Sequence, residues 1–452
     1  MYSLGDPATV GKWEGVVCHG MKHPRPAYEL RKSQVSTPPA VVQLFWRLVK
    51  QYRRHLKSVL DMGAGDCRFA EGGSYDEYVG VEIDRTRAAS ALPPTNGRVI
   101  QGCVFRHSGS DYSACIGNPP YVRHHDVRSP WKEKTIAYLE GRLAVRLNHH
   151  SNLYLYFFCL ALIKSRVDGL VALIIPYEWV SRPAFKPVRD YIRQQRWGVA
   201  VYRFEAHIFE GVMTTASITV IDKSKTRGRW KYYDITKKGR IKRRKDVAGS
   251  KAALDYEKRG KIWATRGLSP GSQKVFTLTE SERKQFGLHK TDVVPCVTTL
   301  RHVPKSLRVL SRPAFKKHFI DAGEKCWLVR SDLDERSTRV NAYLESVPTE
   351  ERATVTCATR ELWFQFRMPS ASSLLFSSGF TRFGPKILIN SVNARCVGSV
   401  TGIHSGGEIA VRALQAYLLK INFEKRVVGH ARLLKKVEIK QLNSVLNSFS
   451  RN

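Results

Sequence analysis

Residues Asn118-Pro119-Pro120-Tyr121 combine groups that could bind and activate an amine. They follow the short apolar run 114–116 and Gly117. Two consecutive prolines fix the backbone φ twice, and the second keeps Pro119 out of the helical region, so the turn is rigid. It offers two acceptors, the Asn118 amide oxygen and the Pro119 carbonyl oxygen, beside an aromatic ring. This set suits an exocyclic amine, because its two N–H groups need two acceptors and its parent ring can stack on Tyr121.

Two other apolar segments end in residues suited to a cofactor that carries a ribose. Gly63 and Gly65 follow a strand that ends at Asp61, and a second strand, 79–81, ends at Glu82. An acid about 20 residues after a glycine turn binds ribose hydroxyls in nucleotide-binding βαβ units. A pyrophosphate-binding turn would need a third glycine near position 68, where Arg68 stands. The pattern therefore favours a cofactor with a ribose and no phosphate, such as S-adenosylmethionine.

The chemistry that fits these residues is methyl transfer to an aromatic amine. Such a nitrogen, for example N6 of adenine, is a poor nucleophile because its lone pair is delocalised into the ring. Two acceptors can draw it toward tetrahedral geometry and stabilise the positive charge that develops on it, which favours the transition state over the ground state. The cationic product can lose its proton to water, so no general base is required.

The order of segments predicts the sheet that would position these groups. An apolar helix over 153–164, a strand over 170–175, a helix over 187–196 and strands over 199–204 and 217–221 continue the α/β alternation. Such alternation predicts a Rossmann-like, mostly parallel sheet that binds ligands at the carboxyl ends of its strands. Asp61, Glu82 and Asn118 all lie at such ends. We also expect a helix that starts with Thr37 as N-cap and Pro38 as its first residue.

Residues 35–225 resemble the catalytic domain of the gamma-group (TaqI-type) N6-adenine DNA methyltransferases. The resemblance rests on the Asn118 turn, on 152–154, on 175–176 and on the segments that would hold S-adenosylmethionine, which contain Thr37, Pro38, Asp61, Gly63, Gly65, Glu82 and Ile83. Segment 207–212 resembles the loop whose aromatic residue stacks on the flipped target base. The resemblance implies that Phe209 and Tyr121 sandwich an adenine. It also implies that Asn118, Pro119, Pro120 and Tyr121 form the catalytic turn.

One position departs from the family pattern. Members usually carry Asp-Phe where this chain has Cys103-Val104, with the Asp accepting from the cofactor's adenine amine and the Phe stacking on it. Cysteine is a poor acceptor and valine offers less surface. We therefore expect weaker cofactor binding, or a substitute acceptor from Asp111.

Composition points to a polyanionic partner. The 452 residues include 75 Lys and Arg against 39 Asp and Glu, a net charge of +36, and 42% are hydrophobic. A globular protein with this imbalance is expected to bind nucleic acid, here double-stranded DNA. No apolar run reaches the length of about 18 residues needed to cross a bilayer, and the first ten residues lack the pattern of a signal peptide. We expect a monomer in the prokaryotic cytoplasm. The nine cysteines form no C-x-x-C pair, and no metal is expected.

The chain is expected to contain four regions: an N-terminal arm (1–33), the methyltransferase domain (34–225), a basic linker (226–262) and a mixed α/β target-recognition domain (263–452). Strands are expected near 325–329, 374–376 and 386–390, and a basic helix through 435–446. Segments 360–366 and 385–390 resemble the target-recognition domains of the same enzymes. DNA phosphates are expected to contact the basic run of the linker, which consists of Lys237, Lys238, Arg240, Lys242, Arg243, Arg244 and Lys245.

The predicted function is therefore site-specific methylation of N6 of a flipped-out adenine, as the modification enzyme of a restriction-modification system. No arrangement of acids and lysine marks a nuclease, so a separate restriction endonuclease would supply cleavage. Four alternatives stay open: cytosine N4 as target, RNA as substrate, protein glutamine as substrate, and a DNA-binding protein whose catalytic pocket has decayed.

Overall fold

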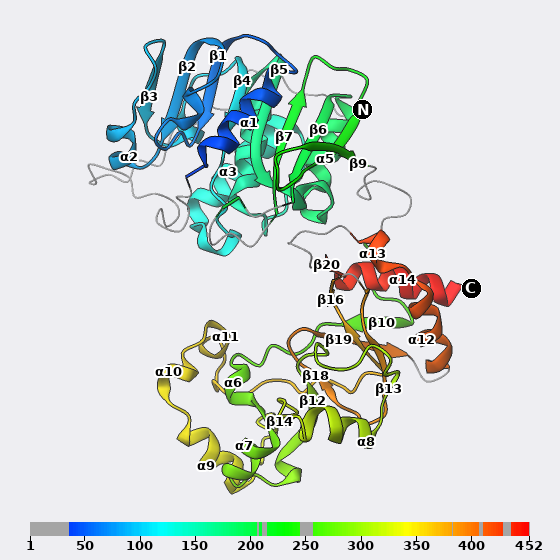
Figure 1. Ribbon diagram of the computed structural model, residues 1–452. Helices are drawn as coiled ribbons and strands as arrows, with labels where there is room; N and C mark the ends of the chain where they lie inside the picture. The colour runs from blue at the N-terminus through cyan, green and yellow to red at the C-terminus, as the bar shows by residue number, and fades with distance from the viewer. Residues whose placement is uncertain are drawn as a thin grey trace, which may run out of the picture. The chain divides into compact units, whose positions relative to one another are not determined.

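The computed structural model describes residues 36–205, 208–209, 215–244, 256–381, 383–405, 410–427 and 435–451. These residues divide into two compact units, 36–244 and a second unit formed by the rest (Figure 1). The predicted N-terminal arm lies outside the described residues, as do Lys245 and most of the segment 207–212.

The first unit is built on a nine-stranded sheet with the order β3-β2-β1-β4-β5-β7-β6-β8-β9. Strands β1 to β5 run parallel to one another, whereas β7 is antiparallel to both β5 and β6. The unit contains, in chain order, α1 (Pro39–Val49), β1 (Leu56–Met62), β2 (Tyr75–Glu82), α2 (Arg85–Ser90), β3 (Gly97–Gln101), β4 (Tyr112–Gly117), α3 (Ser129–Leu143), α4 (Leu153–Lys164), β5 (Ser165–Pro176), α5 (Lys186–Gln194), β6 (Gly198–Phe204), β7 (Ala216–Asp222), β8 (Trp230–Ile235) and β9 (Ile241–Arg244). The predicted Rossmann-like, largely parallel sheet is confirmed.

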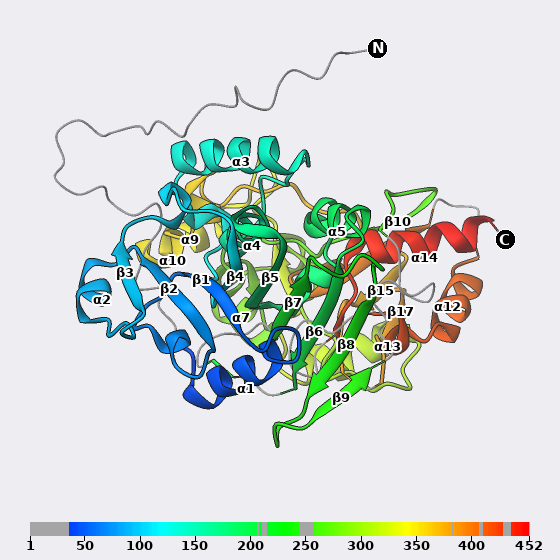
Figure 2. The ribbon, with the colours of Figure 1, turned by 90° about the horizontal axis from the view of Figure 1, so that it is seen from above.

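Helices cover both faces of this sheet, which explains why its central strands are apolar throughout. Every residue from Leu170 to Ile175 on β5 is fully buried. Alternate residues of a strand point to opposite faces, and Leu170, Ala172 and Ile174 share a core with the buried face of α1. Figure 2 shows α1 on one side of the sheet and α3 and α4 on the other. Helix α4 is buried nearly all round, as its continuous apolar sequence predicts.

The start of α1 differs from the prediction by one residue. Pro38, not Thr37, is the N-cap, and Pro39 is the first helical residue. Pro38 has φ −58° and ψ 140°, because a residue that precedes proline is excluded from the helical region. The Pro38 carbonyl accepts from the amides of Val41 and Val42 at 2.9 and 3.2 Å. The Thr37 hydroxyl is therefore not used to cap the helix.

The predicted basic linker is wrong over 226–244. Strands β8 and β9 form an antiparallel hairpin that completes the nine-stranded sheet, and β8 pairs in parallel with β6. The basic run therefore spans the hairpin turn and β9. Segment 230–235, Trp-Lys-Tyr-Tyr-Asp-Ile, is rich in aromatic residues, a composition that fits a strand better than a linker.

The second unit is mixed α/β, as predicted. It contains a five-stranded sheet (β10-β19-β15-β17-β13), a four-stranded sheet (β11-β14-β12-β18) and the pair β16-β20. Its elements are β10 (Ile262–Thr265), α6 (Gln273–Phe276), β11 (Thr277–Leu278), α7 (Glu280–Gln285), β12 (Val293–Val297), β13 (Val309–Leu310), α8 (Arg312–Phe315), β14 (Trp327–Val329), α9 (Thr338–Ser346), α10 (Thr349–Arg352), α11 (Val355–Ala358), β15 (Leu374–Ser377), β16 (Gly379–Phe380), β17 (Ile387–Asn390), β18 (Arg395–Cys396), β19 (Val400–Ser405), α12 (Val411–Lys420), α13 (Phe423–Arg426), β20 (Lys435–Lys436) and α14 (Ile439–Arg451).

The three strands predicted in this unit coincide with β14, β15 and β17, and the predicted final helix coincides with α14, which begins four residues later than expected. Two hydrophobic cores support the unit. One is shared by β11, β12 and β14 with the helices beside them, and the other packs α12 and α14 on the five-stranded sheet. Among the described helices, none has the length and apolar character to cross a bilayer.

Candidate active site

The Asn118 side chain lies just beyond the carboxyl end of β4 and is oriented by Thr37. Asn118 Nδ2 donates to Thr37 Oγ1 at 3.2 Å, and Thr37 is only 5% exposed. This bond sets the direction of the carboxamide. Its oxygen, Oδ1, is buried and has no hydrogen-bond partner among the described residues. A buried acceptor in this state favours a ligand that brings an N–H donor.

Gly117 is required because the strand end approaches Asp61 closely. Its φ is +135°, and a Cβ on this residue would lie 2.9 Å from Asp61 Oδ1 and 3.1 Å from the Met62 carbonyl oxygen. Any side chain would therefore displace the two strand ends that carry Asp61 and Asn118. The register of β1 and β4 is consistent with this contact, because Asp61 pairs with Ile116.

Asp61 is fully buried at the centre of the site. Tyr78 donates its hydroxyl to Oδ2 at 2.6 Å, whereas Oδ1 has no hydrogen-bond partner within the described chain. Burial raises the pKa of the Asp61 carboxyl to about 7, although the Tyr78 hydrogen bond acts in the opposite direction. An acid in this environment would become ionised more readily beside a cationic ligand group.

The glycine turn after β1 is held by the acid at the end of β2. Gly63 and Gly65 have φ of +87° and +59°, which glycine adopts without strain. Glu82 Oε2 accepts from the Gly65 amide at 2.8 Å, and Oε1 accepts from the Asp84 amide at 2.9 Å. Glu82 is 6% exposed, and its remaining lone pairs can accept from ribose hydroxyls. Ile83 follows it at the same edge of the sheet.

These residues fit S-adenosylmethionine. Glu82 supplies acceptors for a ribose, and Asp61 Oδ1 supplies an unused buried acceptor for an ammonium group. Thr37 and Pro38 lie directly before α1, and the Thr37–Asn118 hydrogen bond joins this segment to the turn 118–121. The structure thus brings Thr37, Asp61, Glu82 and Asn118 to one edge of the sheet.

Arg68 was not predicted to take part in the site. Its Nη1 donates to the Thr37 carbonyl at 2.9 Å, and its Nε donates to Asp66 Oδ2 at 2.6 Å. Arg68 therefore ties the segment before α1 to the turn after β1. The only signal in the sequence is that an arginine replaces the third glycine of the dinucleotide pattern. Arg87, on α2, makes a similar contact, because its Nη2 donates to Ser36 Oγ at 3.3 Å.

At the Cys103-Val104 position, Val104 is buried and Cys103 is partly exposed. Val104 begins a 3₁₀ turn, Val104–Arg106, and is 4% exposed. Burial raises the pKa of the Cys103 thiol, so it remains neutral. The expectation that Asp111 could substitute is wrong, because Asp111 precedes Tyr112, the first residue of β4, whereas Asn118 follows the last. The length of the strand separates the two residues.

Tyr121 and Phe209 lie together, but in a geometry that differs from a sandwich. Their ring centroids are 6.2 Å apart and their planes meet at 86°, edge to face. Phe209 is 5% exposed, and the Tyr121 hydroxyl donates to the Ile174 carbonyl at 3.0 Å. A base can enter between the rings only if Phe209 moves. Stacking of a target base on both rings therefore stays a prediction that requires this movement.

The basic run divides into exposed and engaged residues. Lys237, Lys238, Arg240, Lys242 and Arg243 are exposed on the hairpin of β8 and β9. Arg244 is partly buried, where its Nη2 donates to the Tyr177 hydroxyl at 2.5 Å and its Nη1 lies 3.4 Å from Asp234 Oδ1. Arg244 therefore stabilises the sheet, while the five exposed residues are available for phosphate contacts.

Comparison with known proteins identifies the family. Residues 81–209 match the model of the Eco57I restriction-modification methylase, and residues 230–421 match the C-terminal domain of the type II methyltransferase M.Eco57I. The chain belongs to the Eco57I family of restriction-modification methyltransferases. It is therefore a DNA methyltransferase, and the family implies S-adenosylmethionine as the methyl donor. The C-terminal model begins at Trp230, so it includes the hairpin of β8 and β9.

Two curated relatives match over most of the chain. The type II methyltransferase M.AccI of Acinetobacter calcoaceticus is 23% identical over 76% of this chain and 70% of its own length. M.XamI of Xanthomonas campestris pv. amaranthicola is 22% identical over 80% of this chain and 75% of its own. Among solved structures, the type IIG restriction endonuclease BpuSI is 12% identical, with a TM-score of 0.43 over 92% of this chain and 59% of BpuSI.

Proposed function

We propose that this Eco57I-family methyltransferase modifies N6 of a flipped-out adenine in double-stranded DNA, as the site-specific modification enzyme of its restriction-modification system. The observation that carries the proposal is the orientation of Asn118. Thr37 holds the amide nitrogen, so the buried oxygen Oδ1 is left to accept a hydrogen bond. An adenine amino group supplies two N–H donors, one for Oδ1 and one for the Pro119 carbonyl.

The two acceptors would act mainly on the transition state. S-adenosylmethionine, when bound, supplies an electrophilic methyl group on its sulfonium sulfur. Asn118 and Pro119 hold both N–H groups and stabilise the positive charge that appears on N6 as the new bond forms. Pro120 fixes the direction of the Pro119 carbonyl, because the residue before proline stays extended. The methylated amine then loses its proton to water.

Residues around the turn would bind the cofactor and the base. We assign Glu82 to the ribose hydroxyls and Asp61 to the ammonium group of the methionine end, with Thr37, Pro38, Gly63, Gly65 and Ile83 lining the same site and Cys103 and Val104 facing the adenine ring. Tyr121 and Phe209 would stack on the flipped base. Stacking offsets the few kcal/mol that extrusion of a base costs. The exposed lysines and arginines of the hairpin of β8 and β9 would contact phosphates.

The decisive experiment is the methylation of plasmid DNA in cells that express the full chain and lack other DNA methyltransferases. Sequencing that detects modified bases, with mass analysis of nucleosides, should find N6-methyladenine in a single motif. N4-methylcytosine instead would refute the assignment of adenine. Methyl transfer only to RNA or protein would refute the assignment of DNA, and failure to bind S-adenosylmethionine in a titration would indicate a decayed pocket.

Replacing Asn118 with alanine tests the mechanism directly. Turnover should fall by about 10²-fold or more, the scale of losing one preorganised hydrogen bond to a developing charge. Cofactor affinity should change little, because Asn118 is assigned to the base. Near-normal turnover in N118A would contradict the assignment.

A further inference from the structure

Three charged residues of the second unit, Arg330, Asp332 and Arg395, form a cluster that the protein leaves incompletely paired. Arg330 follows β14 directly, and Arg395 begins β18; both strands flank β12 in the four-stranded sheet. Burial lowers the pKa of the Arg395 guanidinium; the charge of Arg330 lowers it further, and that of Asp332 acts in the opposite direction. Two cations therefore share a single nearby acid.

Polar atoms of all three side chains are buried without hydrogen bonds. Arg330 Nε, Arg395 Nε and Asp332 Oδ1 have no partner within the described residues, and the only recorded ion pair is a long one, 3.9 Å between Arg330 Nε and Asp332 Oδ1. The Arg330 and Asp332 side chains are 34% and 13% exposed. Buried polar atoms normally have a hydrogen-bond partner, so these three atoms require an explanation.

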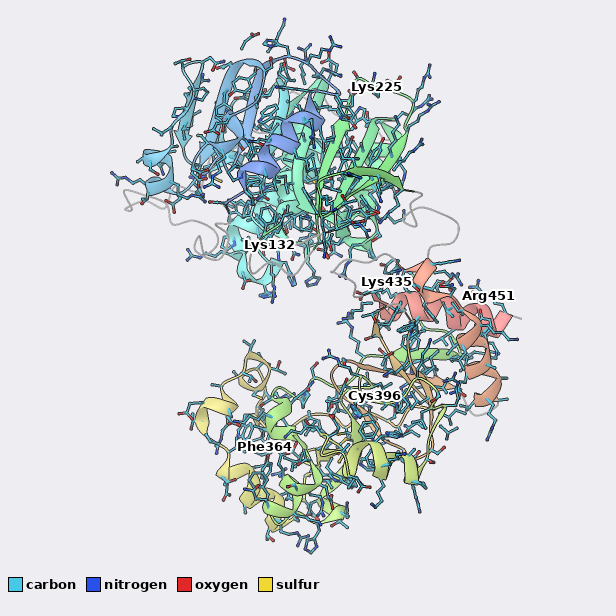
Figure 3. All side chains as sticks on the ribbon, viewed as in Figure 1. Lys132, Lys225, Phe364, Cys396, Lys435 and Arg451 are labelled. Atoms are coloured by element: carbon cyan, nitrogen blue, oxygen red, sulfur yellow. The ribbon has the colours of Figure 1, made fainter. Side chains whose placement is uncertain are left out.

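The backbone that carries these arginines is rigid. Asn390 Nδ2 donates to the carbonyls of Ser372 and Ala394 at 2.9 Å each, and its Oδ1 accepts from the Ala394 amide at 3.0 Å, which fixes the turn directly before Arg395. Next to Arg330, the fully buried Ser331 donates to the Phe364 carbonyl at 2.8 Å. Figure 3 labels Phe364 and Cys396, the residue after Arg395, within this unit. The guanidinium groups are thus positioned by their neighbours, while their Nε donors have no partner among the described residues.

We propose that Arg330 and Arg395 read guanine bases of the DNA target site, and that Asp332 orients Arg330. A guanidinium presents paired donors in a plane, and the O6 and N7 atoms of guanine accept two of them in the major groove. A phosphate offers similar acceptors, but the Asp332 carboxylate would repel it, whereas a base edge is neutral. The proposal rests on the assignment of DNA as substrate and goes beyond it by naming the groups that specify the sequence.

The test is the methylation motif of full-length variants. Wild-type protein and Arg395→Ala are expressed in cells without other DNA methyltransferases, and the genome is read by sequencing that detects both N6-methyladenine and N4-methylcytosine. The wild-type motif should contain guanine. In R395A, sites that carry another base at one guanine position should gain roughly tenfold to hundredfold in methylation relative to sites with guanine there. This is the discrimination that one bidentate contact provides. Arg330→Ala should relax a guanine position in the same way.

Two further variants separate base reading from charge. Arg395→Lys keeps the charge but cannot donate the planar pair, so it should lose discrimination as R395A does. Arg412→Ala, exposed on α12, removes the same charge elsewhere in the unit and should leave the motif unchanged. A motif without guanine, or one unaltered in R395A and R330A, would overturn the proposal. So would full discrimination in R395K, which would assign a phosphate contact.

Thermal unfolding and cofactor binding complete the test. Arg395 is partly exposed and its buried Nε has no partner among the described residues, so its removal should leave the unfolding midpoint of R395A unchanged or higher, whereas a purely structural arginine would lower it. A lower midpoint with an unchanged motif would therefore also overturn the proposal. Cofactor affinity should match the wild type, since no assigned cofactor residue is touched. If R395A fails to fold, R395K decides. Modification of cytosine instead of adenine would refute the proposed target base without affecting this result.

Discussion

Replacing Thr37 with valine should impair catalysis without removing any group that touches the substrate. Thr37 Oγ1 accepts from Asn118 Nδ2 at 3.2 Å in a site where Thr37 is 5% exposed. Valine has nearly the same shape but no acceptor. The buried N–H group then loses its partner, at a cost of about 1–3 kcal/mol. Rotation of the carboxamide by 180° relieves part of this cost, but it turns the NH₂ group toward the base amine, which is itself a donor.

The expected loss is about 1–2 kcal/mol of transition-state stabilisation, which corresponds to a decrease of roughly five- to thirtyfold in turnover. Single-turnover methylation of a short duplex, with saturating cofactor, measures this directly. T37S keeps the hydroxyl and should stay within about threefold of the wild type. Binding of S-adenosylmethionine, measured by titration, should be similar in all three proteins.

Two results would refute this reasoning. If T37V and T37S lose the same activity, the missing methyl group or a packing defect is responsible, not the hydrogen bond. If T37V binds the cofactor much more weakly but turns over normally at saturation, Thr37 serves the cofactor and Asn118 is oriented by something else.

Three other perturbations follow from the same site and its surroundings. Gly117→Ala places a Cβ 2.9 Å from Asp61 Oδ1 on a residue whose φ is +135°. This variant should lose about 1–3 kcal/mol of stability in thermal unfolding and should lose turnover. The control Gly141→Ala on α3, which has open space around it, should show neither loss. Asp61 has a pKa raised by burial to about 7, so its own contribution to stability should be largest below about pH 4 and should fall by up to about 4 kcal/mol as the pH rises from 4 to 7. Denaturant unfolding of the wild type and D61N at a series of pH values isolates this contribution, because D61N should lack this loss; an equal loss in both would contradict the assignment. Lys237, Lys238 and Arg240 of the hairpin are replaced with alanine one at a time. Each replacement should reduce the slope of log DNA affinity against log salt concentration by about 0.9. Replacement of Lys57, which is exposed on β1, should leave this slope unchanged.

The sheet edge that carries the proposed site could be predicted from the sequence because its residues follow apolar strands directly. Asp61, Glu82 and Asn118 each end a run that is too apolar for a surface strand, and the carboxyl ends of neighbouring parallel strands meet at one edge of a sheet. The prediction therefore needed only the type and order of the elements. Glu82 illustrates the limit, because its hydrogen bond to the Gly65 amide depends on the turn after β1 and leaves no trace in its own segment.

The hairpin of β8 and β9 was missed for a different reason. A run of lysine and arginine is the usual composition of a solvated linker, and this signal hid the aromatic composition of the preceding strand, 230–235. The edge of a sheet tolerates such a strand, because charged side chains there discourage pairing with other chains. The basic run of this segment therefore indicates that its side chains are exposed, but it does not indicate that the backbone lacks regular structure.

The arginines that support the two units were also out of reach of a local reading. Arg68 was noticed only as a missing glycine, yet it donates to the Thr37 carbonyl from 31 residues away. Arg330 and Arg395 are brought near each other by strands that flank β12. Contacts of this range depend on sheet order, which the sequence constrains only weakly outside the parallel core.

The role of Thr37, however, follows from the two residues after it, Pro38 and Pro39. Threonine followed by proline is a common helix start, and this favours a hydroxyl bound to the first turn. The second proline changes the outcome, since Pro39 excludes Pro38 from the helical region and makes it the N-cap. The Thr37 hydroxyl is then left outside the helix and accepts from Asn118. The same restriction acts at Pro119-Pro120, so one backbone rule applied twice positions both partners of the hydrogen bond on which the proposed chemistry depends.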